Sequence, residues 1–136
     1  MTAIAILYAD LHVTGRLQSV LEDAGFETEA ARLAEIRDGE LDLLAFFEEH
    51  DPDLVLYEVS PPYPQSLTFM RLLQNLPGAR HRPWMLMATD PAAVIELLGP
   101  TDALLPLPAG PDEAADVVQA VRRQLAPPSP RRTEAA

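Results

Sequence analysis

The stretch DPDLVLYEVSPPYP, residues 51–64, decides the fold class of this chain. Its middle, residues 54–59, is a nearly continuous apolar run, which is typical of a parallel strand covered by helices on both faces. The prolines at 61, 62 and 64 cannot donate backbone hydrogen bonds, so the strand must give way to a loop. The stretch therefore predicts a buried strand whose carboxyl end carries Glu58 and opens into a loop.

Similar strand patterns occur in the sequence before and after this strand. Residues 3–9 and 84–88 are apolar runs that predict two more central strands. Residues 26–30 alternate between polar and apolar side chains, and residues 103–105 stop at a proline, so both predict edge strands. Apolar residues at helical spacing predict helices over about 13–24, about 36–49 with first turns weakened by Gly39, 65–76, 91–98 and 112–125.

Five strands that alternate with five helices predict a parallel sheet with right-handed crossovers and helices on both faces. With the apolar strands in the centre, the order is the flavodoxin-like 2-1-3-4-5 of an α/β three-layer sandwich. We expect one domain over residues 1–125. Residues 126–136 lack apolar periodicity and are rich in proline and arginine, which predicts a disordered tail.

The charge of the chain is strongly negative and unevenly distributed. The formal net charge is −11. Residues 1–121 hold 6 Arg against 20 acidic residues and carry −14, whereas residues 122–136 hold 4 Arg against 1 acidic residue and carry +3. Because so acidic a body repels a phosphate backbone, we expect no direct nucleic-acid binding.

Several kinds of chemistry are excluded by residue types that the chain lacks. It has no cysteine, which excludes disulfides and thiol catalysis, and no lysine, because all ten basic residues are arginine. No nucleophile–base pair or metal-binding cluster is visible, so we expect no enzyme and no cofactor. No apolar run approaches the roughly 20 residues of a membrane helix, and no basic residue precedes the first apolar run as in a secretory signal. We therefore expect a cytoplasmic protein without a membrane partner.

Two stretches resemble bacterial response-regulator receiver domains. Residues 38–44 and 49–61, DGELDLL and EHDPDLVLYEVSP, look like the family's run dG-x-eALelL followed by PDLvLlDvxMP. Residues 82–89, RPWMLMAT, resemble its xPvImlTA strand. The resemblance covers about residues 3–125 and implies a signalling module of two-component systems.

The departures from the family concern phosphoryl transfer. The resemblance puts the phosphoacceptor aspartate on Glu58 and the two adjacent metal-binding acids on Ala9 and Asp10, so one acid is lost. The family's lysine falls on Leu107 or Pro106, its switch hydroxyl on Ala88 or Thr89, and its switch aromatic on Ala103. Phosphoryl transfer to a carboxylate needs a divalent ion held by several acids and a cation on the phosphoryl oxygens. The sequence thus indicates a dismantled phosphorylation site.

We therefore interpret the chain as a stand-alone pseudo-receiver that binds a protein partner without phosphorylation. Asp10 and Thr89 would be remnants of the acidic pocket around Glu58. The carboxylate of Glu58 could be a standing phosphate mimic, an inert part of the scaffold, or a solvated acid at the end of a strand in an unrelated α/β domain.

A second interpretation rests on Asp10, His12 and Gly15. These residues fit the D-x-H-x-x-G signature of corrinoid-binding domains, which share this fold and place that loop after the first strand. The resemblance would make His12 the cobalt ligand and Asp10 its hydrogen-bonding partner. The Gly-Gly that this family shows after the fourth strand is absent, because residues 88–91 read ATDP.

The surface formed by the fourth helix, the fifth strand and the last helix is the expected partner surface, since receiver domains commonly associate there. We expect Leu104 and Leu107 to be exposed on it, with Arg122 and Arg123 close by to orient an acidic partner. A homodimer is a further possibility on the same surface.

Overall fold

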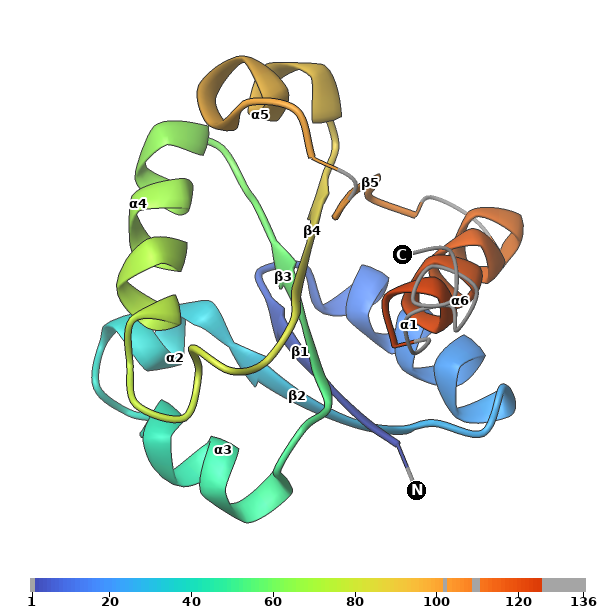
Figure 1. The fold of residues 1–136 in the computed structure, drawn as a ribbon, viewed down its shortest axis with the longest axis horizontal. Coiled ribbons are helices and arrows are strands. Elements are labelled where there is room, and N and C mark those ends of the chain that lie inside the picture. Colours follow the sequence, from blue (N-terminus) through green and yellow to red (C-terminus); the bar gives the residue numbers. More distant parts are fainter. Residues whose placement is uncertain (1, 102, 109–110, 126–136) are drawn as a thin grey trace, which may run out of the picture.

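The computed structural model describes residues 2–101, 103–108 and 111–125, and these form a five-stranded parallel sheet with helices on both faces (Figure 1). The strand order is β2-β1-β3-β4-β5, as predicted. The strands are β1 Ala3–Tyr8, β2 Glu27–Arg32, β3 Leu54–Glu58, β4 Trp84–Ala88 and β5 Leu104–Pro106. The helices are α1 Leu11–Asp23, α2 Leu33–Arg37, α3 Leu43–His50, α4 Tyr63–Gln74, α5 Pro91–Leu98 and α6 Pro111–Leu125.

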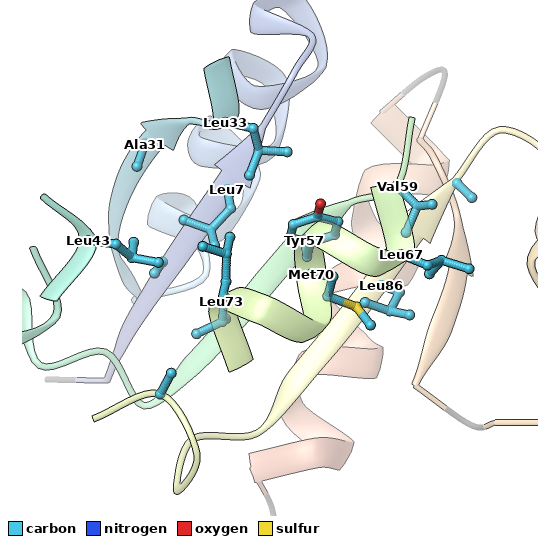
Figure 2. Packing of buried hydrophobic residues seen from close by; sticks show 14 of the residues in the cluster. Leu7, Ala31, Leu33, Leu43, Tyr57, Val59, Leu67, Met70, Leu73 and Leu86 are labelled. Atoms are coloured by element: carbon cyan, nitrogen blue, oxygen red, sulfur yellow. The ribbon is translucent and has the colours of Figure 1, made fainter. Parts of the chain in front are cut away.

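Two apolar layers hold the sheet between the helices. On one face, side chains of β1, β3 and β4 pack against α2, α3, α4 and α5, and Tyr57 and Phe47 are the largest of the fully buried side chains there. Figure 2 shows Tyr57 of β3 next to Met70 of α4, with Leu67 and Leu73 along the same helix. On the other face, the alternate residues of the same strands pack against α1 and α6. The three central strands are therefore apolar on both faces, which explains their continuous apolar runs.

The edge strands lie where the sequence predicts them. Every residue of β1 pairs with a residue of β2, from Ala3 opposite Glu27 to Tyr8 opposite Arg32. The strand therefore extends two residues beyond the predicted end at Ala30 and delivers Arg32 to the carboxyl edge of the sheet. At the other edge, β5 includes Pro106, which pairs with Ala88. An edge strand tolerates this proline because one side of its backbone has no neighbouring strand.

The prediction of a single second helix is wrong, because two helices, α2 and α3, stand in its place. The described residues therefore hold six helices and not five. Gly39 has a φ of +78°, in the left-handed region that interrupts a right-handed helix. A new helix begins after Asp42, whose side chain accepts hydrogen bonds from the N–H groups of Leu44 and Ala45. This N-cap defines the start of α3.

The remaining boundaries shift by a few residues at most. α4 begins at Tyr63, two residues before the predicted start, because Pro64 is tolerated in the first turn of a helix. In the described part of the chain, no helix is both long enough and apolar enough to cross a membrane. The predicted tail, residues 126–136, lies outside the described residues.

Candidate functional site at the carboxyl edge of the sheet

The sequence-predicted pocket residues lie at one edge of the sheet. Asp10 follows β1, Glu58 ends β3 and Thr89 follows β4. Because these strands are parallel and adjacent, their carboxyl ends meet at the edge where this kind of fold binds ligands. Leu7 pairs with Tyr57, so Glu58, the next residue, lies beside the end of β1.

Glu58 is buried and hydrogen-bonded within the molecule. Only 5% of the residue is exposed, and its Oε1 accepts hydrogen bonds from the N–H groups of Ala9 (2.8 Å) and Asp10 (2.9 Å). A buried carboxylate is costly unless hydrogen bonds replace its water, and these two backbone donors supply them. Glu58 is therefore not a solvated strand-end acid. It connects β3 to the loop between β1 and α1.

The side chain of Asp10 caps a helix, which is not the role of a metal-binding acid. Its Oδ1 accepts hydrogen bonds from the N–H groups of His12 (2.9 Å) and Val13 (3.4 Å), which makes it the N-cap of α1. The side chain of Asp10 thus points into the first turn of a helix, while its backbone N–H donates to Glu58. The structure thus joins Asp10 and Glu58 through the backbone N–H of Asp10 and the carboxylate of Glu58.

Thr89 is exposed in the turn between β4 and α5. The next residue, Asp90, caps α5 by accepting from Ala93 N–H (3.3 Å), and its own N–H donates to the Oη of Tyr63 (3.0 Å). This bond joins the start of α4 to the start of α5 across the edge of the sheet. Sequence reasoning missed Tyr63, whose distance of 27 residues from Asp90 gives no local signal.

A divalent ion of the kind implied by the receiver fold does not fit these residues. Ala9 offers no carboxylate, Asp10 caps a helix and Glu58 accepts from two amides. Among the described residues, no group of three or more His, Cys, Asp or Glu side chains is arranged to hold a metal ion. Hard cations such as Mg²⁺ take several oxygen ligands, and the edge presents no such set.

The loop that a corrinoid site would need is absent. Leu11–Gly15 form the first turns of α1, so the Asp10–Gly15 segment is helical after its first residue. Within the described residues, Asp10 accepts from the backbone N–H of His12 and makes no hydrogen bond to its imidazole. The side chain of His12 is exposed. The D-x-H-x-x-G pattern is therefore explained here by a capped helix.

The predicted partner surface is only partly as expected. Leu104 and Leu107 are half-buried, because Leu104 packs on one apolar layer and Leu107 on the other. Arg122 is exposed on α6, and its Nη2 donates to the carbonyl of Ala24 at the end of α1 (3.5 Å). Arg123 is exposed on the same helix. The exposed apolar side chains near this surface belong to α5 and are those of Ile95 and Leu97.

Sequence comparison with models of protein families and with curated proteins finds no match. Solved structures do match. A response regulator from Thermotoga maritima aligns with a TM-score of 0.67 at 14% identity, covering 92% of this chain and 98% of that one. A putative response regulator from Chloroflexus aurantiacus gives 0.66 at 22% identity, covering 93% and 98%. The chemotaxis response regulator CheY4 of Vibrio cholerae gives 0.65 at 18%, covering 89% and 98%. The chain therefore has the flavodoxin-like fold of response-regulator receiver domains.

Proposed function

We propose that this chain is a pseudo-receiver, a signalling module that binds a protein partner without being phosphorylated at the family's acceptor position. The observation that carries the proposal is the pair of hydrogen bonds from Ala9 and Asp10 to Glu58. Because of these bonds, the Glu58 carboxylate at the end of β3 has a structural role. A carboxylate that is 5% exposed and already accepts from two amides is a poor nucleophile towards a phosphodonor.

The lack of a lysine at the end of β5 supports the same conclusion. A developing phosphoryl charge is stabilised by positive groups placed where it forms. The chain has no lysine, and the resemblance puts the family's lysine on Leu107 or Pro106. Leu107 is half-buried against the layer that contains α1 and α6. The β5 side of the edge thus presents an apolar side chain in place of the cation.

Glu58 acts as an inert part of the scaffold in this proposal and not as a phosphate mimic. Its charge is held inside the molecule by backbone donors, so a partner has little of it to recognise. A Glu58→Gln variant keeps an oxygen that can accept from the same amides. We expect its affinity for the native partner to change less than about threefold, below the about 1–3 kcal/mol typical of coupling between sites. A larger loss of affinity would favour the phosphate mimic.

The partner surface consists of α5, β5 and α6 in this proposal. Ile95 and Leu97 are 40% and 49% exposed, and they extend the half-buried edge at Leu104. Arg123 is an exposed cation of α6, whereas Arg122 is directed towards α1. A Ile95→Ser/Leu97→Ser double variant should weaken binding of the partner isolated from the native cell. Leu72→Ser, on the exposed side of α4, is the matched control and should leave binding unchanged.

The experiment that tests the function compares partner affinity with and without a phosphodonor. The partner is first isolated from the native cell with the tagged chain, and its affinity is then measured with purified proteins by isothermal titration calorimetry. We expect the same dissociation constant with and without acetyl phosphate and Mg²⁺. A phosphodonor-dependent change in affinity that disappears in Glu58→Gln would refute the proposal.

A further inference from the structure

A cleft of about 420 Å³ lies at the carboxyl edge of the sheet, between the junction of β2 with α2 and the start of α4. Ala9 borders this cleft and also donates to Glu58, so the cleft adjoins the pocket discussed above without including the Glu58 carboxylate among its lining residues. Its volume falls within the range of about 300–1,000 Å³ that is common for small-molecule pockets.

Two arginines line the cleft. Arg32 is the last residue of β2 and Arg37 is the last residue of α2, and both side chains are exposed to solvent. Within the described ranges, neither Arg32 nor Arg37 has a carboxylate oxygen within the 4.0 Å of an ion pair, unlike Arg82, which pairs with Asp51. Two guanidinium groups outside any ion pair at one cleft are unexpected in a chain whose net charge is −11.

The floor of the cleft carries hydroxyl groups. The Oη of Tyr57 donates to the carbonyl of Ser66 (2.9 Å), and the Oγ of Ser66 accepts from the N–H of Ser60 (3.2 Å). Because Tyr57 uses its proton on that carbonyl, the Ser66 hydroxyl keeps its own proton for the Oη of Tyr57 (3.4 Å) or for a ligand oxygen. Burial raises the pKa of Tyr57, while the Ser66 bond and the charge of Arg37 lower it, so Arg37 lies close enough to act on this phenol.

Part of the cleft lining is apolar. Leu33, Phe69, Pro61 and Pro62 contribute it, and Leu33 is buried while Phe69 is half-buried. The cleft therefore joins a cationic rim and hydroxyl donors to a surface on which a ring or an alkyl group can pack. This combination of apolar lining with a few polar groups is characteristic of small-ligand sites.

We propose that this cleft binds a small phosphate monoester whose organic part is apolar or planar. A phosphate monoester carries a charge of about −1.5 to −2 at pH 7, which the two guanidinium groups balance. Arginine recognises phosphate oxygens in pairs through its planar fork of N–H groups, and Ser66 adds a hydroxyl donor. Leu33 and Phe69 then contact the organic part. The site would let a metabolite act on the module at an edge where the chain has lost the means of phosphorylation.

The test uses phenyl phosphate, which joins a phosphate monoester to one planar ring, and follows backbone amide signals by NMR titration. We expect the amide signals of Ser60, Ser66 and Phe69 to shift. Arg32→Gln and Arg37→Gln should each weaken binding at least about tenfold, the effect of losing a hydrogen bond to a charged group. The matched control is Arg71→Gln, on the exposed side of α4, which should change the affinity less than about twofold.

Four outcomes would overturn the proposal. Phenyl phosphate could leave the cleft signals unchanged, or Arg71→Gln could weaken binding as much as Arg37→Gln, which would indicate attraction to charge in general. Inorganic phosphate could bind as tightly as phenyl phosphate, which would contradict the apolar contact. Binding of a polyglutamate peptide that depends on Arg32, without binding of phenyl phosphate, would assign the cleft to an acidic protein segment.

Discussion

The backbone N–H of Asp10 donates a hydrogen bond to the carboxylate of Glu58 over 2.9 Å, while the side chain of Asp10 turns to the first turn of α1. The two acidic residues therefore do not converge on a shared ligand. One holds the loop after β1 against β3, and the other starts the helix that follows. Both acids of the edge are part of the fold, which is the basis of the predictions below.

Removal of the Glu58 side chain should destabilise the fold. In Glu58→Ala the N–H groups of Ala9 and Asp10 lose the buried carboxylate that accepts from them, and we expect a loss of about 2–3 kcal/mol in the free energy of unfolding. Glu58→Gln keeps an uncharged acceptor, and we expect a loss of about 1 kcal/mol, because hydrogen bonds to charged groups are the stronger ones. Urea unfolding followed by circular dichroism measures both values.

The control for this series is Glu96→Ala, on the exposed surface of α5. It should stay within about 0.5 kcal/mol of the parent chain. If Glu58→Ala behaved like Glu96→Ala, the hydrogen bonds of Glu58 would not contribute to stability, and its structural role would be refuted.

The break between α2 and α3 should depend on Gly39. Its φ of +78° is unfavourable for any residue with a Cβ, although a Cβ there would meet no atom within 4 Å. We expect Gly39→Ala to lower the free energy of unfolding by about 1–2 kcal/mol. Gly15 is the matched position, since it lies inside α1 and also has free space around it.

In contrast, Gly15→Ala should stabilise the chain by about 0.5–1 kcal/mol, because alanine suits a helix interior better than glycine. Thermal or urea unfolding of the two variants gives the comparison. Destabilisation by Gly15→Ala of the same size as by Gly39→Ala would mean that Leu11–Gly15 are not helical, and it would reopen the corrinoid interpretation.

Stability should fall at high pH because of Tyr57. Burial raises the pKa of its phenol above the ordinary 10.0, so the unfolded chain loses this proton at a lower pH than the folded chain does. The contribution is fully present below pH 10 and is lost as the pH rises through the folded pKa. We expect a steeper decline of the free energy of unfolding above pH 10 in the parent chain than in Tyr57→Phe. Equal slopes in urea unfolding between pH 8 and 11 would contradict this.

The strand order could be predicted because it depends on local composition. Apolar runs without alternation mark the buried central strands, and the alternating or proline-limited runs mark the edges. The split of the second helix was harder to predict. It depends on a left-handed residue at Gly39 followed by a cap at Asp42, and each feature alone is compatible with a weakened helix.

The position of Glu58 at the end of a strand was predictable, but its burial and its hydrogen bonds were not. The sequence places Glu58 at the end of a strand, whereas its burial depends on the register that puts it beside Ala9 and Asp10, which lie 49 and 48 residues away in the sequence. The arginine cleft escaped prediction for a similar reason. Arg32 reaches the edge because β2 runs two residues beyond its alternating stretch, and Arg37 follows in a helix of 5 residues too short to show periodicity.

Intact-mass spectrometry after incubation with acetyl phosphate and Mg²⁺ tests the pseudo-receiver proposal most directly. The samples are the parent chain and Glu58→Asp, with a phosphorylatable receiver domain as the positive control. We expect no added phosphoryl group on either, because the resemblance puts the family's second acid on Ala9 and its lysine on Leu107 or Pro106, and Glu58→Asp restores neither. The appearance of one phosphoryl group on the parent chain, mapped to Glu58 or Asp10, would contradict the account.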